Sequence, residues 1–225
     1  MRLARALAAI GRTCITAGVL ILLFVAYQLW GTGIRTAQAQ DRLDAEFEEA
    51  LEEAQQTTTT STTVPDPGEP ETVPPTEPVP IGNPVAQIRI PDIGVDWKVV
   101  EGDSLRELKN GPGHFPETPL PGQEGNSAIA GHRTTYGAPF HRLDELQKGD
   151  EVTVLTFQGE FTYNVDATHI VSPRDVHVVT DKGDNRLTLI ACHPKYSARQ
   201  RIVVVAKLAG DEEPLPAPPI ACPER

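Results

Sequence analysis

The chain has 225 residues, which is enough for one ordinary domain or two small ones. It carries 31 acidic and 20 basic residues, a formal net charge of −11, and this acidity argues against a nucleic-acid-binding protein. Its three cysteines, an odd number at wide spacing, exclude a disulfide-stapled miniature and a cysteine-rich zinc module. The 21 prolines are too many for a single compact domain, so part of the chain is expected to stay unpacked.

The charge is divided unevenly along the chain. Residues 1–35 carry four arginines and no acid, whereas residues 36–84 carry one arginine and eleven acids. Residues 85–210 hold 14 basic and 16 acidic residues and are almost neutral. The acidity therefore belongs mainly to the segment that precedes the expected folded domain.

The N-terminal region has the pattern of a membrane anchor over residues 13–34. Its apolar run from Cys14 to Trp30 has about the length that a helix needs to cross a bilayer core of roughly 30 Å. Arginines precede this run and acids follow it, so the positive-inside rule places residues 1–12 in the cytoplasm. The alternative is a cleaved signal peptide, because residues 37–39 read Ala-Gln-Ala, and the length of the apolar run favours the uncleaved anchor. Both interpretations export the rest of the chain.

Three further segments differ in composition from a folded domain. Residues 35–56 are rich in Ala, Glu, Gln and Leu and are expected to form an acidic helical stem. Residues 57–84 are rich in threonine and proline, cannot bury enough apolar surface to fold, and are expected to be a flexible linker. Residues 211–225, which are rich in proline and acids, are expected to be a disordered tail.

Residues 85–210 have the texture of a β protein, because short apolar or alternating runs recur between Gly, Pro, Asp and Asn. Only 104–109 and 141–146 have the pattern of short helical turns. About eight strands without long helices between them predict an all-β sandwich or closed barrel. The predicted strands are 86–90, 95–99, 127–130, 151–156, 160–171, 176–179, 186–191 and 201–208.

Cys192 is the candidate nucleophile. It follows the strand-like run 186–191 and precedes His193-Pro194, so its side chain would sit at a strand-to-loop junction where it can face a cleft. The competing interpretation is a buried structural thiol. The thiolate is the reactive form, and free cysteine has a pKa of about 8.5, so a nucleophilic cysteine is expected to have cationic neighbours.

Two basic residues are candidates for those neighbours. His132 follows its own short predicted strand after Gly131, a residue that permits close approach of the backbone. Arg201 opens the last predicted strand. If the strand that ends at Cys192 and the strand that begins at Arg201 form an antiparallel hairpin, their facing ends bring the two residues together.

This arrangement resembles the sortase family of cysteine transpeptidases. The resemblance lies in Ala-Gly-His-Arg at 130–133, Thr-Leu-Ile-Ala-Cys at 188–192 and Arg201 before an apolar strand, and it spans about residues 85–208. Ala191 is a departure, since the family has threonine before the cysteine. The segments that look most like class E sortases are 111–116, 131–137 and 192–201.

The resemblance implies a closed eight-stranded sortase-like β-barrel with one or two short helices, and it implies a mechanism. Cys192 would attack the carbonyl between Thr and Gly of an LAxTG- or LPxTG-like sorting signal and form a thioacyl enzyme. Arg201 would donate hydrogen bonds to the developing oxyanion. His132 would act as general acid toward the leaving amine and then as base toward the incoming amine. No cofactor and no metal are expected.

The resemblance also implies partners and a location. The partners would be secreted proteins with a C-terminal sorting signal and the amine of a peptidoglycan precursor, and no nucleic acid. The chain would cross the membrane once and hold its catalytic domain outside the cell, on a Gram-positive, actinobacterial surface.

Tyr136, Ala191 and Arg199 are weaker candidates, assigned to substrate binding. Arg199 competes with Arg201 for the oxyanion role, and Arg201 is favoured because it directly precedes the apolar strand. His193 is not expected to act as a base, since adjacent strand residues point to opposite faces. The histidines that lack metal-ligand spacing and are expected at the surface or in loops are His114, His141, His169 and His177.

Two other functions stay open on the sequence. One is an L,D-transpeptidase or a cell-wall cysteine peptidase, although the order of His before Cys disfavours peptidases in which Cys comes first, and a Ser-His-Gly-Cys signature is missing. The other is a non-catalytic β-barrel binding module on a stalk, in which Cys192 is merely buried.

Overall fold

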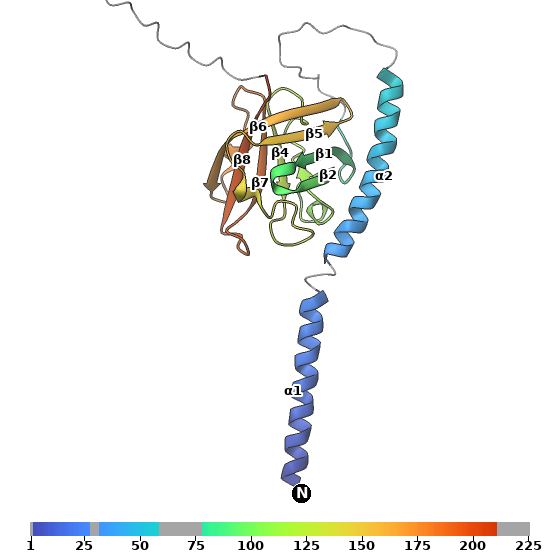
Figure 1. Cartoon of the computed structure of the whole chain (residues 1–225), viewed down its shortest axis with the longest axis vertical. Helices are drawn as coiled ribbons and strands as arrows, with labels where there is room; N and C mark the ends of the chain where they lie inside the picture. The colour runs from blue at the N-terminus through green and yellow to red at the C-terminus, as the bar shows by residue number, and fades with distance from the viewer. Residues whose placement is uncertain (1, 28–31, 59–77, 211–225) are drawn as a thin grey trace, which may run out of the picture.

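A computed structural model describes residues 2–27, 32–58 and 78–210. Figure 1 shows helix α1 (Arg2–Ala26) extending away from a β-barrel, and helix α2 (Thr32–Thr58) running along the side of that barrel. Among these residues, none of the helices combines the length and the apolarity needed to cross a bilayer. The predicted anchor over 13–34 is therefore not confirmed. Residues 28–31 of that segment, most of the predicted linker and the predicted tail lie outside the described residues.

The barrel is closed, with the strand order β1-β2-β3-β4-β7-β8-β6-β5. The β2–β3 and β4–β7 pairs are parallel, and the other pairs are antiparallel. The predicted closed eight-stranded barrel is confirmed. Its strands are β1 (Pro84–Ile90), β2 (Val95–Glu101), β3 (Gly113–His114), β4 (Asn126–Gly131), β5 (Glu151–Thr156), β6 (Gly159–Val171), β7 (Arg186–His193) and β8 (Gln200–Leu208).

The barrel forms because apolar residues alternate along its strands. In β5, Val152 and Val154 are fully buried, while Thr153 between them and Leu155 after them are partly exposed. β7 and β8 supply Leu187, Leu189 and Val204 to the same core. Each side chain of this size contributes about 1.5–3 kcal/mol when it is fully buried.

One predicted strand is wrong and one strand was missed. Residues Val176–Val178 form a 3-10 turn, η5. The carboxylate of Asp175 accepts a hydrogen bond from the backbone N–H of His177 and so caps the start of this turn. The missed strand is β3, which has only two residues and so carries no alternation that a sequence could show. Among the residues that the structure describes, the other 3-10 turns are η2 (Pro91–Ile93), η3 (Glu107–Lys109) and η4 (Leu143–Glu145). The last two lie within the helical turns predicted at 104–109 and 141–146.

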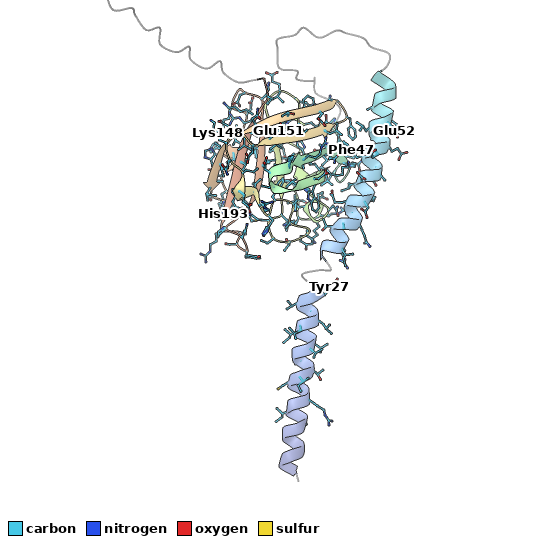
Figure 2. The ribbon with its side chains drawn as sticks, viewed as in Figure 1. Tyr27, Phe47, Glu52, Lys148, Glu151 and His193 are labelled. Carbon is cyan, nitrogen blue, oxygen red and sulfur yellow. The ribbon has the colours of Figure 1, made fainter. Side chains whose placement is uncertain are left out.

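Helix α2 contains the segment predicted as a stem, and it packs against the barrel along β1 and β2. Leu43 and Phe47, four residues apart on one helix face, are fully buried. The Phe47 ring lies 4.9 Å from the ring of Phe157, and Figure 2 shows Phe47 on the side of α2 that faces the barrel. Gln40 adds polar contacts, because its Nε2 donates to the carbonyl of Lys98 at 3.1 Å and its Oε1 accepts from the Lys98 N–H at 2.8 Å. The helix is thus a docked element of the folded unit.

Candidate active site

Three neighbouring strands bring the three predicted catalytic residues to one end of the barrel. In the parallel β4–β7 pair, Gly131 lies opposite Ala191. The next residues, His132 directly after β4 and Cys192 near the end of β7, therefore lie at the same end of two adjacent strands. In the antiparallel β7–β8 pair, Cys192 lies opposite Arg201, which confirms the hairpin expected from the sequence. The next residue along β7, His193, marks this end in Figure 2, on the side of the barrel nearer α1.

The backbone before His132 depends on a close approach at Gly131. A Cβ at this position would lie 2.4 Å from Cδ2 of Phe140, whose ring is fully buried. The N–H of Phe140 donates to the carbonyl of His132 at 3.1 Å. Glycine is therefore required here by packing against Phe140, and this packing fixes the residue that follows.

The His132 imidazole has one nitrogen without a partner. Its Nε2 is buried and makes no hydrogen bond to any residue that the structure describes. On the other side of the ring, Nδ1 lies 3.3 Å from Oγ1 of Thr135. A buried polar atom without a partner is costly, so the Nε2 position is suited to a proton transfer partner or a bound substrate group.

The surroundings of His132 favour its neutral form. Burial lowers the pKa of His132, and the positive charge of Lys109 lowers it further. Lys109 places its Nζ 5.7 Å from the centre of the Tyr136 ring, and that ring lies 4.9 Å from the imidazole of His132. The imidazole is thus available to accept a proton at neutral pH.

Tyr136 reaches His132 through a strained turn. Tyr136, Gly137 and Ala138 all have positive φ, at 51°, 74° and 48°. This left-handed conformation costs a non-glycine residue about 1–3 kcal/mol. The surrounding structure maintains the strain, and the result is an aromatic ring held against the imidazole.

Cys192 carries a free, half-buried thiol at the end of β7. Its neighbour Ala191, a predicted substrate-binding residue, is only 2% exposed and belongs to the barrel core. The neighbour on the other side, His193, has its Nδ1 3.1 Å from Nη1 of Arg133. The imidazole of His193 is therefore hydrogen-bonded to Arg133, in agreement with the expectation that it is not the base.

The two arginines of the β7–β8 connection differ in position. Arg201 lies opposite Cys192 in the sheet register, and its Nη1 donates to the carbonyls of Ala198 at 3.1 Å and Gln200 at 3.0 Å. Arg199 lies in the loop before β8 with an exposed side chain, and its backbone N–H donates to Oγ of Ser197 at 3.3 Å. The register thus places Arg201, and not Arg199, next to the candidate nucleophile.

His114 corrects one expectation from the sequence. It was expected at the surface or in a loop, but it is 1% exposed because β3 lies between β2 and β4. Its Nδ1 lies 2.8 Å from Oε2 of Glu101, and its Nε2 lies 3.0 Å from the carbonyl of Pro119. His169 and His177 are exposed as expected. Within the described residues, none of the His, Cys, Asp and Glu side chains form a group of three that could hold a metal.

The sequence interpretation missed Arg133, Asp144 and Lys109. Arg133 directly follows His132 in the Ala-Gly-His-Arg motif, which was the available signal. It is 2% exposed and pairs with Asp144 at 2.7 Å between Nη2 and Oδ1. Lys109 had no sequence signal, because it approaches His132 from a separate loop.

Comparison with known proteins gives a match over the same part of the chain, the barrel. The family described as Sortase domain matches residues 88–209. Sortase SrtE1 of Streptomyces coelicolor is 32% identical over 92% of this chain and 58% of its own length, so the chain spans little more than half of that relative. Sortase SrtE2 of the same organism is 28% identical over 93% of this chain and 85% of its own length.

Solved structures show the same similarity. The Sortase D5 transpeptidase of Clostridium perfringens superposes with a TM-score of 0.61 at 29% identity, covering 76% of this chain and 98% of that one. Sortase E from Streptomyces avermitilis gives 0.53 at 36% identity, covering 58% and 90%. Sortase E1 of Streptomyces coelicolor, solved with a tripeptide in its active site, gives 0.53 at 31% identity, covering 56% and 88%. With the barrel and more than half of its sequence matched, the chain belongs to the sortase family and resembles its class E members.

Proposed function

We propose that the protein is a transpeptidase in which Cys192 is the nucleophile, His132 the proton carrier and Arg201 the oxyanion donor. The observation that carries the proposal is the strand register, which sets His132 and Arg201 on either side of Cys192 at one barrel end. The Nε2 of His132 supports it, because this buried atom has no hydrogen-bond partner among the described residues and is suited to take and return a proton.

Acylation begins with a neutral imidazole at His132, the form that its lowered pKa favours. When Nδ1–H donates to Oγ1 of Thr135, Nε2 is free to accept the proton of the Cys192 thiol. The sulfur then forms a bond to the carbonyl carbon of the Thr–Gly bond, and the π electrons of the C=O bond move onto the oxygen. As the C–N bond breaks, Nε2 gives its proton to the leaving amine and a thioester remains. Since burial and the charge of Lys109 lower the pKa of His132, its imidazolium is a stronger acid for this transfer than a free imidazolium.

The second step reverses these roles. An incoming amine attacks the thioester, its excess proton passes through Nε2 of His132, and the C–S bond breaks to restore the Cys192 thiol. Arg201 stabilises the oxyanion in both steps. Its planar guanidinium has five donors, so one N–H keeps a loop carbonyl such as that of Ala198 while another turns toward the substrate oxygen.

The proposed donor is a secreted protein with an LAxTG- or LPxTG-like sorting signal, and the proposed acceptor is the amine of a peptidoglycan precursor. Tyr136 is the best supported of the proposed substrate-binding residues, because its ring lies beside His132. Arg199, exposed in the loop before β8, is a second candidate, and Ala191 would contribute only through the shape of the buried wall below Cys192.

We also propose attachment to the cell membrane through residues 13–34, with residues 1–12 in the cytoplasm and the barrel outside. The support is the sequence pattern alone: an uncharged segment with three arginines before it and acidic residues after it. Membrane fractionation of cells that express the full chain tests this proposal, and recovery of the full-length chain in the soluble fraction would contradict it.

A peptide transfer assay tests the activity, using the full chain, LAxTG and LPxTG peptides and an amine acceptor. We expect Cys192→Ala to abolish product, while Cys14→Ala, a change to the exposed thiol on α1, leaves turnover within twofold of the wild type. Turnover that survives in Cys192→Ala would overturn the proposal. A wild-type chain that makes no product and has an unreactive Cys192 thiol would support the binding-module alternative instead.

A further inference from the structure

Arg133 is a buried charged side chain that makes several polar contacts beside the site. It is 2% exposed, and each of its three guanidinium nitrogens has a partner. Nη2 pairs with Oδ1 of Asp144 at 2.7 Å, and Nε donates to the carbonyl of His141 at 3.4 Å. Nη1 donates to the carbonyl of Cys192 at 3.2 Å and to Nδ1 of His193 at 3.1 Å.

A guanidinium buried to this degree is tolerated only when its charge and its donors are satisfied. Partial burial acts to raise the pKa of Asp144, but the hydrogen bond and charge of Arg133, together with the charge of Lys195, hold that pKa below its ordinary value. Asp144 is therefore ionised and compensates the charge of Arg133. Nζ of Lys195 lies 3.6 Å from Oδ1 of the same carboxylate. This ion pair connects the loop after Cys192 to Asp144.

These contacts join the two segments that carry the reacting atoms. Arg133 directly follows His132 in the chain, so its backbone fixes the end of the histidine loop. The carbonyl of Arg133 accepts from Nδ1 of His141 at 2.8 Å, which secures this backbone a second time. Its side chain meanwhile bonds to the backbone of Cys192. A single residue thus connects the position of the imidazole to the position of the thiol.

We propose that Arg133 is a positioning residue that holds the backbone of Cys192 at a fixed distance from His132, so that the thiol and Nε2 can exchange a proton. This inference rests on the proposed function of Cys192 and His132. The planar fork of arginine suits the task, because it can bond to Asp144 and to Cys192 in different directions at once, whereas lysine offers one point charge. A misplacement of about 1 Å at a reacting pair can cost about 100-fold in rate.

The test compares four variants of the full chain: Arg133→Gln, Arg133→Lys, Asp144→Asn and the control Arg142→Gln. Arg142 is the matched control because it also pairs with an acid of the η4 turn, Glu145 at 2.7 Å, but with side chains that are 47% and 45% exposed. In the peptide transfer assay we expect Arg133→Gln to lower kcat about 30- to 100-fold with KM changed less than threefold. Arg133→Lys should recover part of this loss, and Arg142→Gln should stay within twofold of the wild type.

A second measurement does not need the transfer reaction. Alkylation of Cys192 by iodoacetamide at pH 7 reports on the thiol and its imidazole neighbour, and we expect it to be at least about fivefold slower in Arg133→Gln and about threefold slower in Asp144→Asn. If the wild type makes no transfer product but these differences appear, the proposed function fails and the positioning role stands.

Thermal unfolding separates positioning from plain stabilisation. All rates are measured well below the Tm of each variant, so a variant that is merely less stable but correctly assembled keeps its kcat and its alkylation rate. That result in Arg133→Gln would overturn the proposal. If Arg133→Gln does not fold, then wild-type rates in both Arg133→Lys and Asp144→Asn would overturn it equally.

Discussion

At the scale of single residues, the site is controlled by the charge and the burial of His132. Burial lowers the pKa of His132 first, and Lys109 lowers it further. Lys109 reaches this position from the η3 turn and lies over the ring of Tyr136, which in turn lies against the imidazole. The protonation state of His132, the proposed proton carrier, therefore depends on a lysine from another part of the chain.

Lys109→Ala removes the charge but not the burial, so the pKa of His132 should rise and still stay below its ordinary value. In the proposed mechanism a neutral imidazole accepts the thiol proton, so kcat/KM should fall off at a higher pH on the acid side than in the wild type. An NMR titration of the His132 ring and the pH–rate profile measure the two effects. Lys148→Ala is the control. It also removes one lysine ammonium, but in the wild type this ammonium pairs with Asp166 at 2.8 Å. An unchanged or lower pKa of His132 in Lys109→Ala would contradict this account.

At the scale of elements, helix α2 supplies part of the covering of the barrel. Phe47 is fully buried, and Lys98 on β2, itself only 5% exposed, lies beneath the helix. The ammonium of Lys98 bonds to Oδ1 of Asp44 at 2.9 Å and lies 4.8 Å from the centre of the Phe47 ring. The docked helix thus satisfies a buried charge of the sheet, which a free stem would leave without these partners.

Phe47→Ala should lower the free energy of unfolding by about 3 kcal/mol, as is typical for removal of a buried aromatic ring. The loss cannot exceed the docking energy of α2, since the helix can detach before the barrel unfolds. Hydrogen exchange of the α2 amides and chemical denaturation measure the two processes. The neighbouring exposed Glu48→Ala should change stability by less than about 0.5 kcal/mol. Equal exchange rates in Phe47→Ala and the wild type would show that the contact does not hold the helix.

At the scale of the whole molecule, the sequence predicts the elements that have a regular hydrophobic pattern, and it does not predict the segments that lack one. Alternating strands and turn residues predict the barrel, and the strand ends predict the register that joins Cys192 to Arg201. The 176–179 segment was wrongly predicted as a strand because its valines favour strands. Residues Val176–Val178 instead form the η5 turn between β6 and β7, outside the sheet.

The contacts that the sequence could not supply are those between segments that no shared periodicity relates. The Arg133–Asp144 pair joins the loop after β4 to the η4 turn, so no periodicity relates its members. Leu43 and Phe47 lie at helical spacing, but this pattern does not identify the surface that covers them. Tertiary packing decides both, and each of them bears on the site or on its cover.

Two deletions separate the contributions of the two helices to the molecule. A chain that begins at residue 32 keeps α2 and the barrel, so its Tm should stay within about 2 °C of the full chain. A chain that begins at residue 78 loses the buried Leu43 and Phe47 and exposes the surface they cover, which should cost about 3 kcal/mol or more and lower the Tm by roughly 6–12 °C.

The second deletion should also reach the site. Oγ1 of Thr36 donates to the carbonyl of Lys109 at 2.9 Å, and Nε2 of Gln40 donates to the carbonyl of Asn110 at 2.8 Å, so α2 fixes the loop that presents Lys109 to His132. Without α2 this loop loses both bonds, and the pKa of His132 should rise as it does in Lys109→Ala. NMR titration of both deletions is the measurement. If the pKa of His132 is the same in the chains that begin at 32 and at 78, then α2 covers the barrel without influencing the chemistry at its end.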